Sequence, residues 1–276
     1  MVRTLFMGSP DFAVPSLRAL VGAGHSVVGV ITQPDRAAGR GGRLAEPPVK
    51  PVARELSIPV FQPESMREPE TVELIAGLRP RVVVVAAYGE ILPRAVLAIP
   101  TRGSLNVHAS LLPRWRGASP VAAAIRAGDA ETGVSIMEVV RKMDAGPVVS
   151  RASLPIERDS TTGTLEPRLA DLGAELLVET LPDWEQGAIE PVPQDDESAT
   201  YCHILQKKDA HLSADLTATE AERAVRAYDP WPGAHVLYRD QRLALWRGHV
   251  APRQAAPGST HVVDGLPAIA FRDGLL

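Results

Sequence analysis

The sequence predicts an α/β fold in which a doubly wound, mostly parallel sheet is followed by a small C-terminal β-barrel (OB-like) domain. Two observations support this prediction. Over the first two thirds of the chain, short apolar runs alternate with segments of helical spacing, which is the pattern of a parallel sheet covered by helices on both faces. The last third instead holds short strand-like segments separated by turn residues, which is typical of a small β-rich domain.

The buried strands are expected where β-branched residues run without polar alternation. The clearest is Val82–Val85, four valines in succession, which favours a central strand. The run Val2–Met7 stops at Gly8-Ser9-Pro10 and is followed by apolar residues at helical spacing, which indicates strand, turn and helix. Further strands are expected at 26–32, 104–107, 134–139 and 147–154, and helices at 52–56, 70–78, 118–127 and 164–181.

The domain organisation is predicted from a change in composition. Residues 183–197 carry six acids and no base, together with Pro191 and Pro193, and such a stretch is typical of an exposed connector. We therefore expect a catalytic domain over residues 1–188, a linker over 189–203 and a C-terminal domain over 204–276. Within the last, a helix is expected at 218–227 and hairpin strands at 234–238 and 243–246.

The overall composition bounds the class of protein. The net charge of -4 argues against an indiscriminate nucleic-acid binder, and a single cysteine, Cys202, excludes an intrachain disulfide and a multi-cysteine metal site. The seven histidines form no H-E-x-x-H pattern, so we expect no metal. The sequence has no apolar run of membrane-spanning length and no signal-peptide pattern at its start. We expect a soluble, cytoplasmic protein without membrane contact, and a monomer.

The polar residues with the strongest chemical signal lie at the end of a predicted strand. Asn106 and His108 are two apart, so in an extended chain both side chains point to the same face, beyond the carboxyl end of a sheet strand where ligands collect. An amide and a protonated imidazole could both donate to the oxyanion of an acyl transfer. If Asp144 packs beside His108, its carboxylate would favour the charged imidazole. The alternatives are two residues that merely end a strand and an aspartate that only forms a turn.

Other chemistries have little support in the sequence. The turn at Met7–Phe12 has one glycine where a dinucleotide loop needs three, and Gly39–Gly42 lacks the Lys-Ser/Thr of a phosphate-binding loop. Ser110 does not lie in a G-x-S-x-G elbow, so serine hydrolysis is not favoured.

Several motifs together resemble a known family. They are GSPDF at 8–12, QPDRAAGRG at 33–41, AYG at 87–89 with ILP at 91–93, NVHASLLPRWRGASP at 106–120, GDAETGVSI at 128–136 and MDAG at 143–146. With these motifs the chain closely resembles the formyltetrahydrofolate-dependent formyltransferases. The resemblance covers nearly the whole first domain and implies the Rossmann-like fold of that family.

The resemblance also implies site residues and a co-substrate. Asn106, His108 and Asp144 fall on the family's catalytic trio. The family's folate-binding stretch falls on Ser110, Leu111, Leu112 and Pro113. The implied formyl donor is 10-formyltetrahydrofolate.

The loop around Arg40 points to an acceptor within the family. The Q-P-D-R…G-R-G loop is typical of members that formylate the α-amine of methionine on initiator tRNA for translation initiation, and it implies tRNA contacts by Arg40, Arg36 and Arg43. The alternative for this loop is a solvated segment without a partner. The alternative acceptor is an amino sugar, and a different class is a catalytically silent folate- or RNA-binding regulator.

The end of the sequence departs from the family pattern. Relatives usually continue for some tens of residues beyond a segment like Ile269–Leu276. A naturally short protein and a truncated chain are both left open by this departure, which bears on tRNA affinity and on the stability of the barrel rather than on the chemistry of the first domain.

Overall fold

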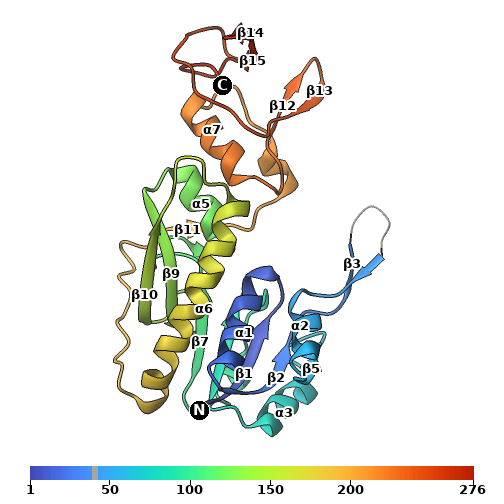
Figure 1. Cartoon of the computed structure of the whole chain (residues 1–276), viewed down its shortest axis with the longest axis vertical. Helices are drawn as coiled ribbons and strands as arrows, with labels where there is room; N and C mark the ends of the chain where they lie inside the picture. The colour runs from blue at the N-terminus through green and yellow to red at the C-terminus, as the bar shows by residue number, and fades with distance from the viewer. Residues whose placement is uncertain (39–42) are drawn as a thin grey trace. The chain divides into compact units, whose positions relative to one another are not determined.

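The computed structural model describes residues 1–38 and 43–276. Its main sheet has seven strands in the order β10-β9-β7-β6-β1-β2-β5 (Figure 1). The strands β7, β6, β1, β2 and β5 run parallel to one another, and β9 pairs antiparallel to β7. The bounds of the seven strands are β1 (Arg3–Gly8), β2 (Ser26–Ile31), β5 (Val60–Phe61), β6 (Val82–Ala86), β7 (Ser104–His108), β9 (Glu131–Glu138) and β10 (Val148–Pro155).

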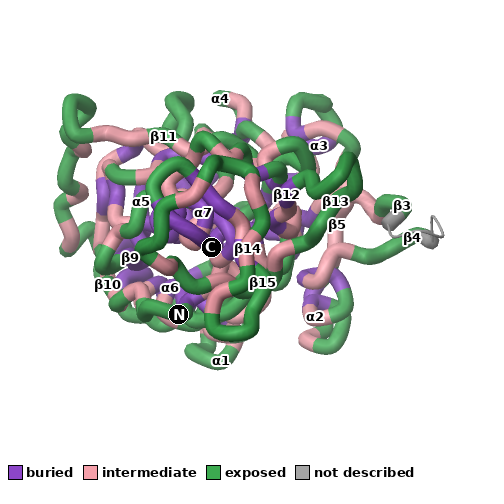
Figure 2. The backbone as a smooth tube through the Cα atoms, turned by 90° about the horizontal axis from the view of Figure 1, so that it is seen from above, coloured by how far each residue is buried: buried purple, intermediate pink, exposed green. Residues whose placement is uncertain are grey.

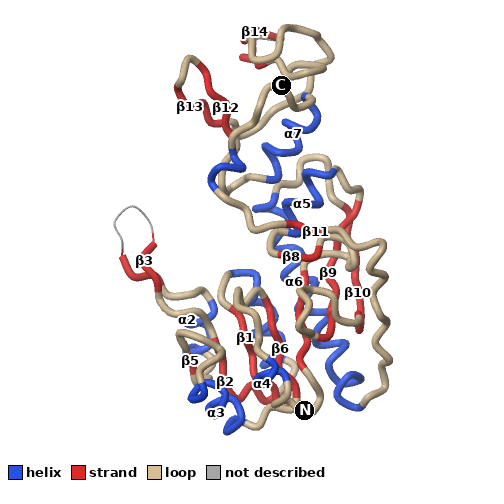
Figure 3. Tube along the Cα trace, turned by 180° about the vertical axis from the view of Figure 1, so that it is seen from behind, coloured by secondary structure: helices blue, strands red, loops and turns tan. Residues whose placement is uncertain are grey.

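Helices cover both faces of this sheet. One face carries an apolar cluster in which Leu5 and Met7 of β1 meet Ile75 of α3 and Val96 of α4. The other face is covered by α1 and α6, which lie in front of β1 and β7 in Figure 1, whereas the view from behind in Figure 3 shows α4 on the opposite side. The helices are η1 (Asp11–Ala13), α1 (Val14–Gly22), α2 (Val49–Glu55), α3 (Pro69–Leu78), α4 (Arg94–Leu97), α5 (Pro120–Ala127), α6 (Thr162–Gln186), η2 (Lys207–Ala210) and α7 (Ala218–Ala227).

The remaining strands form short two-stranded sheets. Near the N-terminus β3 (Arg36–Ala38) pairs antiparallel with β4 (Arg43–Ala45). In the C-terminal part β12 (His235–Tyr238) pairs with β13 (Gln241–Ala244), and β14 (Thr260–Val263) pairs with β15 (Leu266–Ile269). A further pair is β8 (Arg116–Gly117) with β11 (Tyr201–Cys202).

The predicted elements of the first domain are confirmed, and the sheet is mostly parallel as expected. The C-terminal segment contains the predicted helix, as α7, and the predicted short strands, and its closure into a barrel stays a prediction. Close contacts divide the chain into two compact units. One contains 1–116, 133–153 and 167–200, and the other contains 117–132, 154–166 and 201–276. These units are discontinuous in sequence. The predicted division into consecutive segments, 1–188, 189–203 and 204–276, stays a prediction.

The described residues contain no helix that is long and apolar enough to cross a membrane.

Candidate active site

The last residue of β7 is His108, and the strand holds it firmly. β7 pairs with β6 on one side and with β9 on the other, where His108 stands opposite Ser135. The residue is 6% exposed. A strand that is bonded on both sides has little freedom to shift, so the position of the imidazole is set by the sheet itself.

Asn106 and His108 share a face of the sheet, as the spacing predicts. Val107 between them points to α6, where Gly173 approaches so closely that a Cβ on it would lie 2.7 Å from the Val107 Cγ1 atom. Because side chains alternate along a strand, Asn106 and His108 face away from α6. Asn106 is half-buried and His108 is buried.

The two ring nitrogens of His108 have different neighbours. The Nε2 atom lies 2.9 Å from the carbonyl oxygen of Trp115, which can only accept, so Nε2 is the donor of that hydrogen bond. The Nδ1 atom lies 3.9 Å from an Asp144 carboxylate oxygen. That separation allows an ion pair but exceeds a direct hydrogen bond. The Nδ1 atom therefore faces the Asp144 carboxylate but is too far from it for a direct hydrogen bond.

Asp144 lies in a tight turn between β9 and β10. Its backbone φ is 47°, a left-handed conformation that aspartate tolerates better than most residues. Two residues later, a Cβ on Gly146 would overlap the carbonyl oxygen of Glu138. The M-D-A-G motif is thus explained by geometry, since the glycine lets the turn press against the end of β9 and brings Asp144 to His108.

The predicted folate-binding stretch follows β7 directly and is fixed by Ser135. The Ser135 hydroxyl donates to the Ser110 carbonyl at 2.7 Å and accepts from the Leu112 N–H at 3.1 Å. Ser110 is fully buried, and its own hydroxyl donates to the Arg114 carbonyl at 2.6 Å. Leu112 packs with two apolar residues of β9 and β10, and Leu111 and Pro113 are half-buried. These bonds hold the loop in one conformation beside His108.

The structure therefore brings His108 and Asp144 together and places the 110–113 loop next to them. No sequence argument had singled out Ser135. The signal for it is a polar residue within the otherwise apolar stretch Val134–Met137, because a buried hydroxyl requires partners.

Two of the predicted tRNA-contacting residues, Arg36 and Arg43, belong to the hairpin of β3 and β4. Arg36 is exposed and donates to the Gln33 side-chain oxygen at 3.1 Å. Arg43 begins β4, and Arg40 lies outside the described residues. The exposed residues of this hairpin are coloured green in Figure 2.

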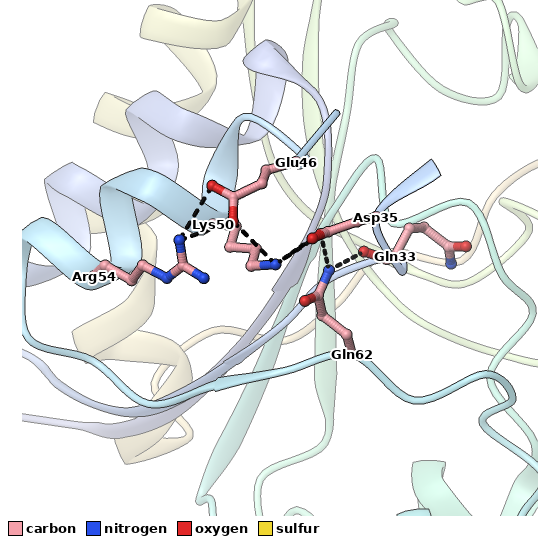
Figure 4. A network of polar contacts seen from close by, with 6 residues as sticks. All are labelled: Gln33, Asp35, Glu46, Lys50, Arg54 and Gln62. Atoms are coloured by element: carbon pink, nitrogen blue, oxygen red, sulfur yellow. Dashed lines mark hydrogen bonds and ion pairs between the residues drawn. The ribbon is translucent and has the colours of Figure 1, made fainter. Parts of the chain in front are cut away.

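A polar network holds the base of this hairpin (Figure 4). Lys50 of α2 is 7% exposed and contacts Asp35 at 2.6 Å and Glu46 at 3.2 Å. The Gln62 amide donates to Asp35 at 2.7 Å and to the Gln33 carbonyl at 2.8 Å. Lys50, which sequence counting places among the basic residues of the loop, is thus occupied by two carboxylates.

The charges of this network stabilise one another. Hydrogen bonds from Gln62 and Lys50 lower the pKa of Asp35. The hydrogen bond to Asp35, reinforced by that to Glu46, raises the pKa of Lys50. Since Asp35 precedes the hairpin and Glu46 follows it, one ammonium group joins its two ends.

Comparison with known proteins identifies the family. Residues 2–181 match the family described as "Formyl transferase", and residues 204–276 match "Formyl transferase, C-terminal domain". The chain therefore belongs to the formyl transferase family.

Similar curated proteins carry a more specific name. A protein of Chloroflexus aurantiacus named methionyl-tRNA formyltransferase is 51% identical over 250 residues, which cover 91% of this chain and 81% of that protein. A protein of Acidithiobacillus ferrooxidans with the same name is 49% identical over 277 residues, which cover 99% of this chain and 88% of that protein.

Solved structures share the fold at much lower identity. The N-formyltransferase of Helicobacter canadensis, solved with folinic acid and dTDP-3-aminofucose, has a TM-score of 0.72 at 16% identity and covers 100% of this chain and 97% of its own. HypX of Aquifex aeolicus, solved with tetrahydrofolic acid, has a TM-score of 0.64 at 19% identity and covers 99% of this chain and 43% of its own.

Within the described residues, no group of three or more His, Cys, Asp and Glu side chains could hold a metal ion.

Proposed function

We propose that the chain transfers a formyl group from 10-formyltetrahydrofolate to the α-amine of methionine esterified to initiator tRNA, for translation initiation. The single observation that carries the chemistry is the His108–Asp144 pair at the end of β7. The proposed acceptor is supported by relatives that are 49 to 51% identical in sequence and are named methionyl-tRNA formyltransferase. We further propose that the enzyme works in the cytoplasm, as a monomer and without a metal.

The reaction is an acyl transfer through a tetrahedral intermediate. The lone pair of the methionine amine forms a bond to the formyl carbon, and the carbonyl π electrons move to oxygen as an oxyanion. The attacking nitrogen loses a proton, the bond from carbon to N10 breaks as the carbonyl reforms, and N10 gains a proton. The products are formylmethionyl-tRNA and tetrahydrofolate.

Each member of the trio has a role in this proposal. The Asn106 amide and the His108 imidazolium donate to the oxyanion, which concentrates hydrogen-bond energy in the transition state. Because Nε2 of His108 donates to Trp115, the Nδ1–H is the donor left for the reaction. Asp144 orients that ring, stabilises its charge and assists proton transfer, directly or through a water molecule that spans the 3.9 Å separation.

The donor binds along the loop Ser110, Leu111, Leu112 and Pro113. Its support is the position of this loop, directly after His108 and fixed by Ser135. A loop that is already held in one conformation loses little entropy when a ligand binds. The formyl carbon can thereby be presented to the His108 side of the strand.

The tRNA is contacted by the segment from Gln33 to Lys50, with Arg36, Arg40 and Arg43 as cations toward the phosphates. The support is the exposure of Arg36 and the rigid base that Lys50 provides. The C-terminal domain would add contacts to the sugar-phosphate backbone of the tRNA.

An amino sugar is the second candidate acceptor, because solved neighbours of the same fold act on sugars. Those neighbours are only 15 to 16% identical, and the methionyl-tRNA formyltransferases are 49 to 51% identical. The test is a formylation assay with 10-formyltetrahydrofolate and either methionyl initiator tRNA or a nucleotide-linked amino sugar. Transfer to tRNA supports the proposal, and transfer to the sugar alone contradicts it.

A further inference from the structure

The connector between the two family domains runs beside both loops that flank His108. At Val192 it forms an antiparallel bridge with Val148, the first residue of β10, with both N–O distances at 2.8 Å. This bridge places the following residues beside the turn that carries Asp144. The acidic composition predicts an exposed linker here, but individual side chains of the connector bond to the catalytic loops.

Gln194 joins the connector to the Asp144 turn. Its amide Nε2 donates to the backbone carbonyl of Asp144 at 2.9 Å and to that of Gly146 at 2.7 Å. Its Oε1 accepts from the Arg116 Nε at 2.9 Å. The orientation of the amide is dictated by these partners, because carbonyls only accept and a guanidinium only donates. The amide nitrogen and the amide oxygen of Gln194 therefore both form hydrogen bonds.

Arg116 binds the same stretch of the connector at Asp196. Its side chain is fully buried and contacts the Asp196 carboxylate at 2.7 Å. A buried guanidinium needs a carboxylate or other acceptor beside it, so this contact holds the connector against Arg116. The pKa of Asp196 is lowered by hydrogen bonds from Lys142 and Arg116.

Thr200 joins the connector to the loop on the other side of His108. Its hydroxyl accepts from the Trp115 N–H at 2.9 Å, and its carbonyl accepts from the Arg116 N–H at 2.9 Å. Trp115 is the residue whose carbonyl receives the His108 Nε2–H, and it has a left-handed φ of 60°. Such a backbone conformation is costly for a bulky residue and persists only where its surroundings enforce it.

We propose that Gln194 and Thr200 are positioning residues, and that the connector acts as a strap that sets the geometry of His108 and Asp144. Gln194 fixes the turn of Asp144, and Thr200 fixes the Trp115 carbonyl that orients the imidazole. In this proposal the strap contacts the catalytic loops and neither substrate. Its effect falls on the alignment of the catalytic groups in the transition state, and hence on kcat rather than on KM.

This inference rests on the proposed function, and one set of variants separates the two. Gln194→Glu keeps an acceptor for Arg116 but places an oxygen against the two carbonyls, and we expect kcat to fall by about 100-fold, the usual cost of a misplaced catalytic group. Gln194→Met, which lacks both donors without adding a charge, is the milder companion if the first variant folds poorly. Thr200→Val should lower kcat, and Thr200→Ser should restore it.

The matched control is Asp195→Asn, one residue from both Gln194 and Asp196. Asp195 accepts hydrogen bonds within the connector, from Glu197 and Ser198, so this variant should retain kcat and KM. In folded Thr200→Val protein, the His108 Nε2–H resonance observed by ¹⁵N-resolved NMR should shift or broaden, and in Asp195→Asn it should not.

The outcomes are distinct. Folded Gln194 and Thr200 variants with normal kcat, alongside an inactive His108→Ala variant, would overturn the strap and leave the proposed function standing. A rise in KM at unchanged kcat would overturn it as well, since the connector would then hold a substrate. A fully active His108→Ala variant would instead overturn the proposed function.

Discussion

Two regions of the molecule each hold an acid beside a base, and they are built in opposite ways. At the base of the β3–β4 hairpin, Lys50 contacts Asp35 at 2.6 Å and a second carboxylate at 3.2 Å. At the end of β7, the His108 and Asp144 side chains stop at 3.9 Å. The Lys50–Asp35 pair, called the closed pair below, is in direct contact. In the His108–Asp144 pair, called the separated pair, the Nδ1 atom makes no direct hydrogen bond to the carboxylate. We infer a structural role for the Lys50–Asp35 pair, and the proposed catalytic role falls to the His108–Asp144 pair.

The largest expected effect comes from breaking the separated pair. In the proposed mechanism His108→Ala removes an oxyanion donor, so we expect the single-turnover formylation rate to fall by about 10³-fold or more. Rapid-quench measurement with saturating donor and methionyl-tRNA checks this. An unchanged rate would show that the imidazole takes no part in the chemistry.

The next largest effect tests how the separated pair is placed. Gly146→Ala puts a methyl group against the Glu138 carbonyl, so the turn must move outward and carry Asp144 with it. We expect a fall in kcat of about 100-fold, with methionyl-tRNA affinity retained. Ala145→Gly, in the same turn, is the control. If Gly146→Ala keeps full kcat, the close packing of the turn is irrelevant to catalysis.

A smaller effect is expected at the closed pair, and it should fall on binding and stability. Lys50→Met leaves the Asp35 carboxylate without its ammonium, so the melting temperature should drop and tRNA should bind more weakly, while the rate at saturating tRNA is kept. Arg18→Ala, which breaks an exposed pair with Glu55, should do neither. A normal melting temperature in Lys50→Met would refute the anchoring role.

The closed pair also predicts a pH dependence. Because the folded state lowers the pKa of Asp35, its stabilising contribution is complete above the ordinary carboxyl pKa of about 3.9 and is lost as pH falls through the lower folded value. Wild type should therefore melt higher than Asp35→Asn near neutral pH, and the gap should close below about pH 4. A gap that stays constant down to pH 2 would contradict the shift.

The smallest effect concerns Arg40, which lies outside the described residues. Arg40→Ala should reduce the slope of log Kd against log salt for methionyl-tRNA by about 1, the value expected for one lost phosphate contact. Equal slopes in variant and parent would remove Arg40 from the interface.

The contrast between the regions also explains what the sequence could predict. Strands such as Val82–Val85 can be predicted from the sequence because burial on both faces requires uninterrupted apolar residues. The β3–β4 hairpin was not predicted, because its two strands contain only arginine and alanine apart from Leu44 and show no alternation of apolar and polar residues. The same charged residues give no sign of which of them are paired: Lys50 counts as a loop cation until the structure shows it buried between two acids.

The site was predictable in part for a similar reason. Asn106 and His108 share a face by strand alternation alone, but the approach of Asp144 depends on how β9 and β10 bring their connecting turn back to β7. Nor can composition show that Gln194 bonds to that turn, because the acids around it give the whole segment the character of an exposed linker.

The account is tested most directly by comparing Asp144→Asn with Asp35→Asn in single-turnover formylation of methionyl initiator tRNA at saturating concentrations. Each substitution removes one carboxylate charge without changing its shape. We predict that Asp144→Asn slows the reaction by about 10³-fold and that Asp35→Asn leaves the rate unchanged. Equal rates in the two variants would contradict the assignment of chemistry to the separated pair and of support to the closed one.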